Sequence, residues 1–246
     1  MSGTHIELQA ADGTCNAYVA RPAGPGPFPA VLFLMDGIGL RETLERMADR
    51  VADKGYLVLL PNLYYRSGAF APFDPAKVFA GGPELDRAKA LMDAIGGDES
   101  AMRDVGRFLD WFDGQPEVIR GKAACLGYCL GGGFALRAAC AYPKRVALAA
   151  SFHGGGFVAD ASSPAVIADR IQSRVYLGVA EIDRRHTPAV TEALEAALAE
   201  ARVPHAIELY PGTKHGFAVA DVPAYDEAAA ERHWQRLSEQ LWAAFQ

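Results

Sequence analysis

A cysteine lies between two glycines in the stretch Gly127-Tyr128-Cys129-Leu130-Gly131. This spacing is typical of a turn in which a strand passes sharply into a helix and presents one side chain at its tip. Glycines, which lack a Cβ atom, tolerate the close contacts of that turn. A thiol at the tip predicts a thiolate nucleophile. The alternative is a glycine-rich turn around a small buried cysteine that packs as a hydrophobe.

Two side chains further along the chain could complete a catalytic site with Cys129. A thiol with an ordinary pKa of about 8.5 is mostly protonated at neutral pH, so it needs a base or a positive neighbour. Asp183 follows the apolar run 175–179, and His215 follows the apolar run 207–210. This order matches triads in which an acid orients the histidine that exchanges a proton with the nucleophile. We therefore expect Cys129, Asp183 and His215 to be catalytic, although Asp183 could instead pair with a neighbouring arginine.

The five other histidines compete with His215 for the role of base. His186 lies close enough to the predicted acid in sequence to be an alternative. His153 follows the apolar run 146–152 and precedes three glycines, which predicts a position beside Cys129 in the pocket. Alternatively, backbone groups at the glycine turn satisfy its ring. The histidines expected to be structural or solvated are His5, His205 and His233.

Backbone N–H groups near the nucleophile are expected to hold the negative oxygen of a reaction intermediate. Such a site combines the N–H of the residue after the nucleophile with one from the loop after the first buried parallel strand. Here these donors are Leu130 and either Gly37 or Ile38, in the loop 36–39. The loop could equally be an ordinary turn.

The scaffold for these residues is predicted from alternating strand and helix patterns. Short apolar runs indicate buried strands, and amphipathic or alanine-rich stretches indicate helices. Their alternation predicts an α/β fold with a mostly parallel, doubly wound sheet and flanking helices, and Asp12-Gly13 predicts a β-hairpin before it. Loops at the carboxyl ends of such strands gather into one site. The expected strands are 31–35, 56–60, 122–126, 146–152, 175–179 and 207–210, and the expected helices are 41–54, 98–112, 132–142, 188–201 and one from about residue 225.

Composition narrows the class of protein. With 246 residues, half of them hydrophobic, the chain can bury the core of one domain, expected over residues 1–246. A net charge of −6 and the lack of a basic run argue against nucleic acid and anionic membranes as partners. No export leader or bilayer-length apolar run is present, so we expect a cytoplasmic protein. The spacing of the four cysteines predicts reduced thiols and no zinc site.

Residues 64–97 form a connection rich in glycine, proline and aromatic residues, where one crossover would suffice. Long connections of this kind often carry function. We expect the segment either to cover the active site or to be a surface insertion with a short helix at 84–94.

Taken together, the motif 127–132, Asp183 and His215-Gly216-Phe217 resemble the dienelactone hydrolase family of α/β-hydrolases. The resemblance extends over nearly the whole chain, with weaker support from Gly55-Tyr56 and Pro61-Asn62-Leu63-Tyr64. It implies an α/β-hydrolase fold and a triad of cysteine, aspartate and histidine that hydrolyses an enol-lactone without a metal or organic cofactor. Further candidate pocket residues, next to the nucleophile and the histidine, are Tyr128 and Phe217, together with His153.

Two departures from the family pattern bear on the thiol and on the substrate. The resemblance places Asp36 where the type member has a glutamate that contacts the resting thiol. Because a nearby carboxylate raises a thiol pKa, Asp36 could share a proton with Cys129 until substrate displaces it. The type member also holds its substrate carboxylate with arginines, and the stretch 215–219 contains none, so we expect an apolar or differently placed anionic substrate. Arginines that could substitute, or could be surface charges only, are Arg66, Arg87 and Arg184.

These observations predict a cysteine-dependent hydrolase of a small-molecule carboxylic ester or (enol-)lactone that forms an acyl-enzyme on Cys129. Enol or aryl esters, whose leaving groups depart readily, suit a thiolate better than unactivated alkyl esters. Two alternatives stay open. One is a thioesterase or acyltransferase with the same acyl-enzyme, and the other is a non-catalytic small-molecule binding or redox-sensing protein. The sequence does not distinguish a monomer from a dimer.

Overall fold

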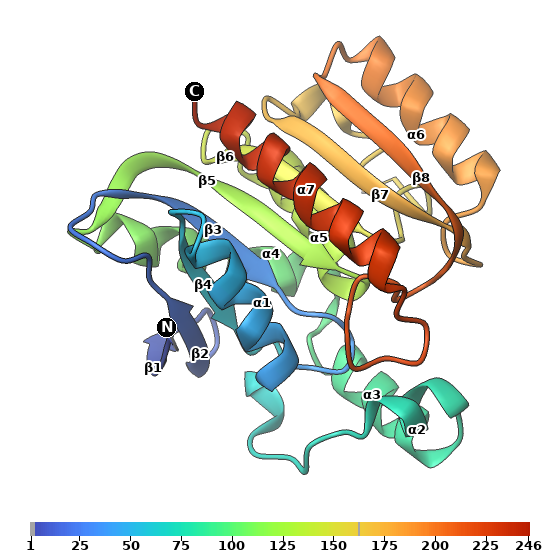
Figure 1. The fold of residues 1–246 in the computed structure, drawn as a ribbon, viewed down its shortest axis with the longest axis horizontal. Helices are drawn as coiled ribbons and strands as arrows, with labels where there is room; N and C mark the ends of the chain where they lie inside the picture. Colours follow the sequence, from blue (N-terminus) through green and yellow to red (C-terminus); the bar gives the residue numbers. More distant parts are fainter. Residues whose placement is uncertain (1–2, 162) are drawn as a thin grey trace.

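An eight-stranded sheet forms the centre of the protein in the computed structural model, which describes residues 3–161 and 163–246 (Figure 1). The strand order is β1-β2-β4-β3-β5-β6-β7-β8. Every neighbouring pair from β4 through β8 is parallel, and the predicted hairpin β1-β2 joins this sheet antiparallel to β4. The strands are β1 (Thr4–Gln9), β2 (Thr14–Ala20), β3 (Phe28–Leu34), β4 (Leu57–Pro61), β5 (Val118–Tyr128), β6 (Val146–Phe152), β7 (Arg174–Ile182) and β8 (His205–Lys214).

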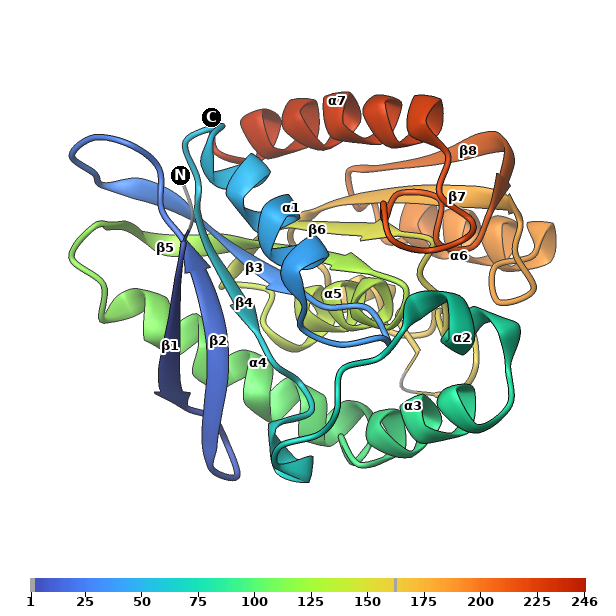
Figure 2. The same ribbon diagram turned by 60° about the horizontal axis from the view of Figure 1, so that its bottom comes forward.

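Helices cover both faces of the sheet, as expected for a doubly wound fold. Figure 2 shows α1 and α7 on one face, and α4, α5 and α6 on the other. Helix α5 is apolar except for Arg137, and it is packed between the sheet and α4. The α/β fold class predicted from the sequence is therefore confirmed. The long helices are α1 (Glu42–Ala52), α4 (Gly97–Asp113), α5 (Leu130–Ala141), α6 (Pro188–Glu200) and α7 (Glu227–Ala244), and none of the described helices is long and apolar enough to span a membrane.

The connection between β4 and α4 contains more helix than predicted. It carries a 3-10 turn, η1 (Tyr65–Ser67), and two helices, α2 (Pro75–Ala80) and α3 (Pro83–Asp93). Helix α2 begins after Asp74, whose side chain accepts a hydrogen bond from the Ala76 N–H. Both helices lie beside the carboxyl ends of the parallel strands (Figure 2), so the segment lies where a site is expected.

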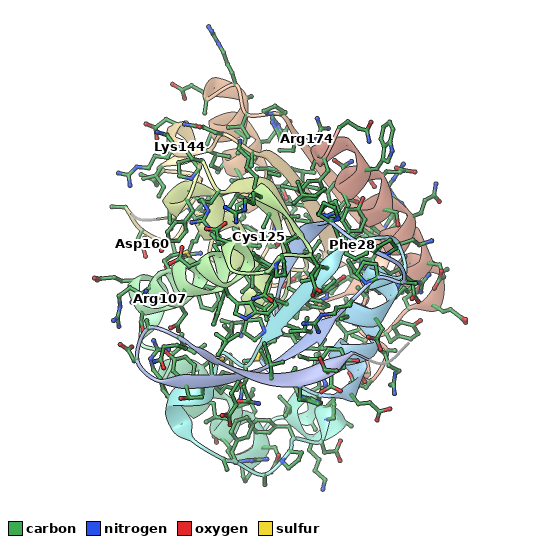
Figure 3. The ribbon with its side chains drawn as sticks, turned by 90° about the vertical axis from the view of Figure 1, so that its left-hand side faces the viewer. Phe28, Arg107, Cys125, Lys144, Asp160 and Arg174 are labelled. Carbon is green, nitrogen blue, oxygen red and sulfur yellow. The ribbon has the colours of Figure 1, made fainter. Side chains whose placement is uncertain are left out.

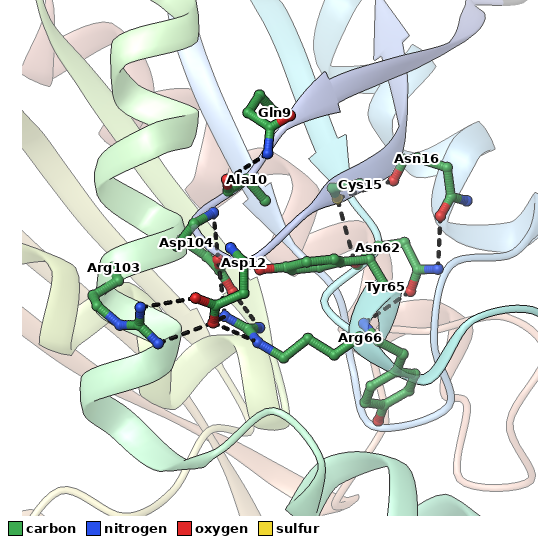
Figure 4. Close-up of polar contacts among 12 residues, drawn as sticks. Gln9, Ala10, Asp12, Cys15, Asn16, Asn62, Tyr65, Arg66, Arg103 and Asp104 are labelled. Atoms are coloured by element: carbon green, nitrogen blue, oxygen red, sulfur yellow. Dashed lines mark hydrogen bonds and ion pairs between the residues drawn. The ribbon is translucent and has the colours of Figure 1, made fainter.

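A network of ion pairs fixes the first part of this connection (Figure 4). The Arg66 guanidinium lies between Asp12 of the hairpin turn and Asp104 of α4, with N···O distances of 2.7 and 2.6 Å. Asp104 is fully buried and also accepts a hydrogen bond from the Tyr65 hydroxyl at 2.7 Å. Arg103 adds a second, exposed contact to Asp12. The hairpin, η1 and α4 are thereby joined through one buried carboxylate.

Three of the four cysteines lie in the interior, and none of the four is in a disulfide. Figure 3 shows Cys125 among the side chains that surround the sheet. Burial raises the pKa of Cys15, Cys125 and Cys140 to about 12. These thiols are therefore protonated at neutral pH and act as small apolar side chains.

Candidate active site

The backbone at Cys129 has the strained geometry of a nucleophile elbow. Cys129 is the last residue before α5 and has φ of 52° and ψ of −113°. A Cβ atom at Gly127 would lie 2.0 Å from the carbonyl oxygen of Gly131, and one at Gly131 would lie 2.1 Å from that of Leu34. Only glycine fits at either position. Strand β5 and helix α5 therefore approach closely enough to hold the thiol at the tip of the turn.

The structure brings the three predicted triad residues together. Cys129, Asp183 and His215 each follow directly after a parallel strand: β5, β7 and β8. His215 Nδ1 lies 2.6 Å from Asp183 Oδ2, and the His215 ring and the Cys129 thiol line the same cavity closely enough to shift each other's pKa. A second hydrogen bond, from the Arg185 backbone N–H to Asp183 Oδ1 at 2.9 Å, holds the carboxylate. The carboxylate can therefore orient the imidazole against the thiol.

This contact shifts the pKa of both members of the pair. Burial alone would raise the pKa of Cys129, but the hydrogen bond and positive charge of His215 bring it below its usual value, with a smaller effect of Arg185. Burial would likewise lower the pKa of His215, yet its bonds to Asp183 and Cys129 raise it to about 10. The two directions favour transfer of the thiol proton to the imidazole, which gives a thiolate beside an imidazolium.

One of the expected backbone donors is already engaged. The Ile38 N–H donates to Asp36 Oδ1 at 2.9 Å, so the prediction that it could hold an oxyanion is wrong in this conformation. Gly37 lines the cavity above Cys129, and its carbonyl is fixed by the Tyr64 hydroxyl at 2.9 Å. Leu130 is the first residue of α5, where a backbone N–H has no partner within its helix. The candidate donors are thus reduced to Gly37 and Leu130.

Asp36 is paired with an arginine rather than with the thiol. Its Oδ1 and Oδ2 accept hydrogen bonds from Arg41 Nη1 and Nη2 at 2.8 and 2.9 Å, and the same guanidinium contacts Asp221 at 2.7 Å. Both oxygens of Asp36 therefore already accept hydrogen bonds, from Arg41 and, at Oδ1, also from the Ile38 N–H. The proton-sharing hypothesis is therefore not supported, and Asp36 acts on the thiol as a nearby negative charge that raises its pKa.

A cavity of about 550 Å³ opens above Cys129 and His215. Helices α2 and α3 form one wall, so the segment 64–97 covers the candidate site instead of being a separate surface insertion. A second cavity of about 420 Å³ meets the first at Cys129, His215 and Arg185, and is lined also by Arg137 and Asp98. Cavity residues from the covering helices are Val78, Phe79, Leu85 and Met92, and apolar residues opposite them are Val219 and Val222.

Of the three predicted pocket residues, His153 alone is part of the cavity wall. The Tyr128 hydroxyl is directed away from the thiol and lies 2.6 Å from His233 Nε2, in the core next to α7. Phe217 is fully buried and its ring stacks on Tyr210. The alternation of side chains along a strand places Tyr128 behind the elbow. The pocket prediction therefore does not hold for Tyr128 or Phe217.

The remaining histidines are engaged elsewhere. His186 Nε2 lies 3.0 Å from the Thr191 hydroxyl, so it does not compete with His215 for Cys129. His5 and His205 contact glutamates, Glu45 and Glu195. Among residues 3–161 and 163–246, no group of three or more histidine, cysteine, aspartate or glutamate side chains is arranged to hold a metal ion.

The arginines that line the candidate site come from the loop after β7. Arg66 belongs to the hairpin network, and Arg87 pairs with Glu84. Arg184 lines the larger cavity, and Arg185, expected from the sequence only as an alternative ion-pair partner of Asp183, lines both cavities. The only sequence signal for Arg185 is its position two residues after Asp183.

The family model of the dienelactone hydrolase family matches residues 15–245. The chain belongs to this family. A relative from Salmonella typhi is 30% identical over 91% of this chain and 80% of its own length, and the carboxymethylenebutenolidase of Rhodococcus opacus is 29% identical over 90% and 84%. The solved structure of P91, a dienelactone hydrolase-like promiscuous phosphotriesterase from metagenomic libraries, superposes with a TM-score of 0.79 at 22% identity, covering 96% of this chain and 95% of P91.

Membership of the dienelactone hydrolase family confirms the resemblance drawn from the elbow and the ordered triad, and it makes the chain a carboxylic ester hydrolase. In this chain Gly216, Phe217, Ala218 and Val219 follow the histidine. The loop that continues from them contributes Asp221, which binds Arg41. This stretch therefore supplies apolar cavity wall through Val219 and Val222, and a carboxylate that is paired with Arg41.

Proposed function

We propose that the chain is a cysteine-dependent hydrolase of small-molecule carboxylic esters or lactones that works through an acyl-enzyme on Cys129. The observation that carries the proposal is the chain of contacts from Cys129 through His215 to Asp183, with the thiol pKa lowered and the imidazole pKa raised. A thiolate next to an imidazolium has its nucleophile and its general acid ready in one pair.

Acylation begins when the Cys129 thiolate attacks the substrate carbonyl carbon. The negative oxygen of the tetrahedral intermediate accepts hydrogen bonds from the N–H groups of Gly37 and Leu130. The intermediate collapses, the carbon–oxygen bond to the leaving group breaks, and the His215 imidazolium gives its proton to the departing oxygen. The products of this half are a thioester on Cys129, a neutral His215 and a free alcohol, or the freed hydroxyl end of a lactone.

Deacylation reverses the proton transfer. Neutral His215 takes a proton from water, and the resulting hydroxide attacks the thioester carbonyl. Collapse of the second intermediate breaks its carbon–sulfur bond and expels the Cys129 thiolate beside the imidazolium already formed, with Asp183 opposite Nδ1 of His215 throughout. One water is consumed and one carboxylic acid is released for each ester cleaved.

The cavity and the thiol support the class of substrate and the location. The wall from α2 and α3 is apolar, which favours an acyl group with substantial apolar surface. A nucleophilic thiol must also stay reduced, and this supports the cytoplasmic location expected from the sequence. Aryl and enol esters are the preferred candidates because their leaving groups depart readily from a thiolate adduct.

Intact-mass spectrometry of the protein mixed with an aryl ester tests the proposal. We expect an acyl adduct that maps to Cys129 and decays in water at the rate of steady-state turnover. Cys129→Ala should lose both the adduct and turnover, whereas Cys140→Ala, which removes another cysteine eleven positions further along in α5, should keep both. Turnover in Cys129→Ala, or a wild-type adduct that never decays, would overturn the hydrolase mechanism.

A further inference from the structure

His153 is a buried histidine whose ring has no polar partner. It follows β6 directly, is 1% exposed, and lines the larger cavity beside Cys129. Its ring centroid lies 5.1 Å from that of His215 and 5.6 Å from that of Phe217. Within the described part of the chain, neither Nδ1 nor Nε2 has a hydrogen-bond partner.

Other buried histidines of this protein are satisfied. His233 Nε2 lies 2.6 Å from the Tyr128 hydroxyl and its Nδ1 lies 2.9 Å from the Ala230 carbonyl oxygen. His186 contacts Thr191. A buried polar group without a partner is costly, and such groups in native proteins call for a specific explanation. His153 therefore differs from its counterparts in a way that packing does not explain.

The backbone, and not the ring, holds His153 in place. Its φ is 40°, in the left-handed region that non-glycine residues rarely adopt, and its N–H donates to the Gly178 carbonyl at 2.8 Å. Strained backbone of this kind is concentrated at functional sites, where the surrounding structure enforces it. His153 thus lies in the cavity wall with both ring nitrogens buried and, among the described residues, without a protein partner.

The His153 ring is neutral. Burial, together with the positive charge on His215, holds the pKa of the imidazole well below its usual value. A neutral imidazole offers one N–H donor and one nitrogen acceptor. It can therefore bind a polar group by hydrogen bonding, while His215 performs the proton transfers at the thiol.

We propose that His153 is a specificity-determining residue that hydrogen-bonds an oxygen substituent on the acyl part of the substrate. This inference rests on the proposed ester hydrolase function, because it assigns the acyl part to the cavity under α2 and α3. The covering helices contribute apolar side chains to that wall, among them Val78, Leu85 and Met92, and the charged side chains of the cavity include Arg184 and Arg185. A neutral keto or hydroxyl oxygen that reached His153 would find its partner there, and the substrates selected are acyl esters or lactones that carry such an oxygen.

Two aryl esters of nearly equal shape test this role: p-nitrophenyl 5-oxohexanoate and p-nitrophenyl 5-methylhexanoate. Wild-type protein should favour the oxo ester by roughly tenfold or more in kcat/KM. His153→Phe, which keeps an aromatic ring but no nitrogen, should remove this preference. His153→Gln, which keeps a donor and an acceptor and has the same backbone constraint, should restore part of it. His5→Phe, at an exposed site in β1, is the control for loss of a histidine and should behave as wild type.

The outcomes separate this inference from the proposed function. If His153→Phe keeps the wild-type ratio of kcat/KM between the two esters, the inference is overturned. Equal losses of kcat on both esters would also overturn it, because they would mean that His153 only positions His215. Binding to Cys129→Ala protein, followed as the rise in Tm with each ester, reads the preference without turnover. A larger rise with the oxo ester that depends on His153 supports the inference even if wild type hydrolyses neither ester. Equal rises in Tm overturn it.

Discussion

Cys129 differs from the other cysteines mainly through its neighbours. Burial raises the pKa of the Cys15, Cys125 and Cys140 thiols to about 12, and weaker opposing effects, such as the Asn62 carbonyl near Cys15 and the Arg137 charge near Cys140, do not reverse this. At Cys129 burial also raises the pKa, but His215 outweighs it, although Asp36 acts in the opposite direction. The reactivity of the elbow therefore depends on charges that come from other strands.

Activity should depend on pH through the pair of Cys129 and His215. Attack needs the thiolate and departure of the leaving group needs the imidazolium. We therefore expect kcat/KM to rise as Cys129 loses its proton, below the usual thiol pKa, and to fall as His215 loses its own near pH 10. Asp183→Asn removes a carboxylate that raises the pKa of His215, so the basic limb should move to lower pH and kcat should fall roughly 10³- to 10⁴-fold.

A pH profile of kcat/KM, measured together with the alkylation rate of Cys129 by iodoacetamide, checks this expectation. His186→Asn is the matched control, because His186 lies near Asp183 but its ring contacts Thr191. It should leave both limbs in place. A basic limb that does not move in Asp183→Asn would show that Asp183 does not set the protonation of His215.

The reactive residues of the candidate site could be predicted from the sequence. The ion pairs that set the charge near the thiol could not. The two glycines around Cys129 and the order of Asp183 and His215 are local signals, and the structure brings these residues together. The pairing of Asp36 was not predictable in the same way. Arg41 lies five residues further on, and it is oriented by Asp221, 180 positions away in the sequence. Only the fold brings these three charges together.

At the scale of elements, apolar runs in the sequence predicted the buried parts of strands and helices well. The exposed parts of strands and the shortest helix were predicted poorly. Strand β5 starts at Val118, earlier than expected, because residues 119–122 are exposed and only Ile119 among them is apolar. Strand β8 runs on to Lys214 through Pro211 and Gly212, and the pairing register shifts opposite them, between Ala180 and Ile182. Helix α2 is only six residues long and was missed because so short a stretch gives no periodic signal.

Helices α2 and α3 should control which acyl groups bind. Phe79 of α2 lines the cavity, and its ring lies against Gly216, next to His215. Phe79→Ala should lower kcat/KM about tenfold for aryl esters of long apolar acids, because apolar contact area is lost, and should have little effect on the acetate ester. Phe73→Ala, in the same connection but outside the cavity wall, is the control. Equal losses on the long-chain ester and the acetate would contradict a role in acyl selection.

At the scale of the whole molecule, the hairpin, η1 and α4 are held together at Asp104. This buried carboxylate contacts Arg66 at 2.6 Å, the Tyr65 hydroxyl at 2.7 Å and the Ala11 N–H at 3.1 Å. Its partners come from the hairpin turn and from the start of the connection that covers the site (Figure 4). Through them, one side chain of α4 fixes both the edge of the sheet and the segment leading to α2.

Removing this carboxylate should destabilise the fold. Asp104→Ala leaves the mostly buried Arg66 guanidinium without its main counter-charge, and loss of one partner of a buried ion pair costs about 3 kcal/mol or more in the free energy of unfolding. Arg103→Ala removes an exposed contact to the same network and should change stability little, because solvent screens that ion pair. Urea unfolding of the two variants and the wild type measures both effects. If Asp104→Ala unfolds at the same urea concentration as the wild type, the ion-pair network around Asp104 does not stabilise the fold.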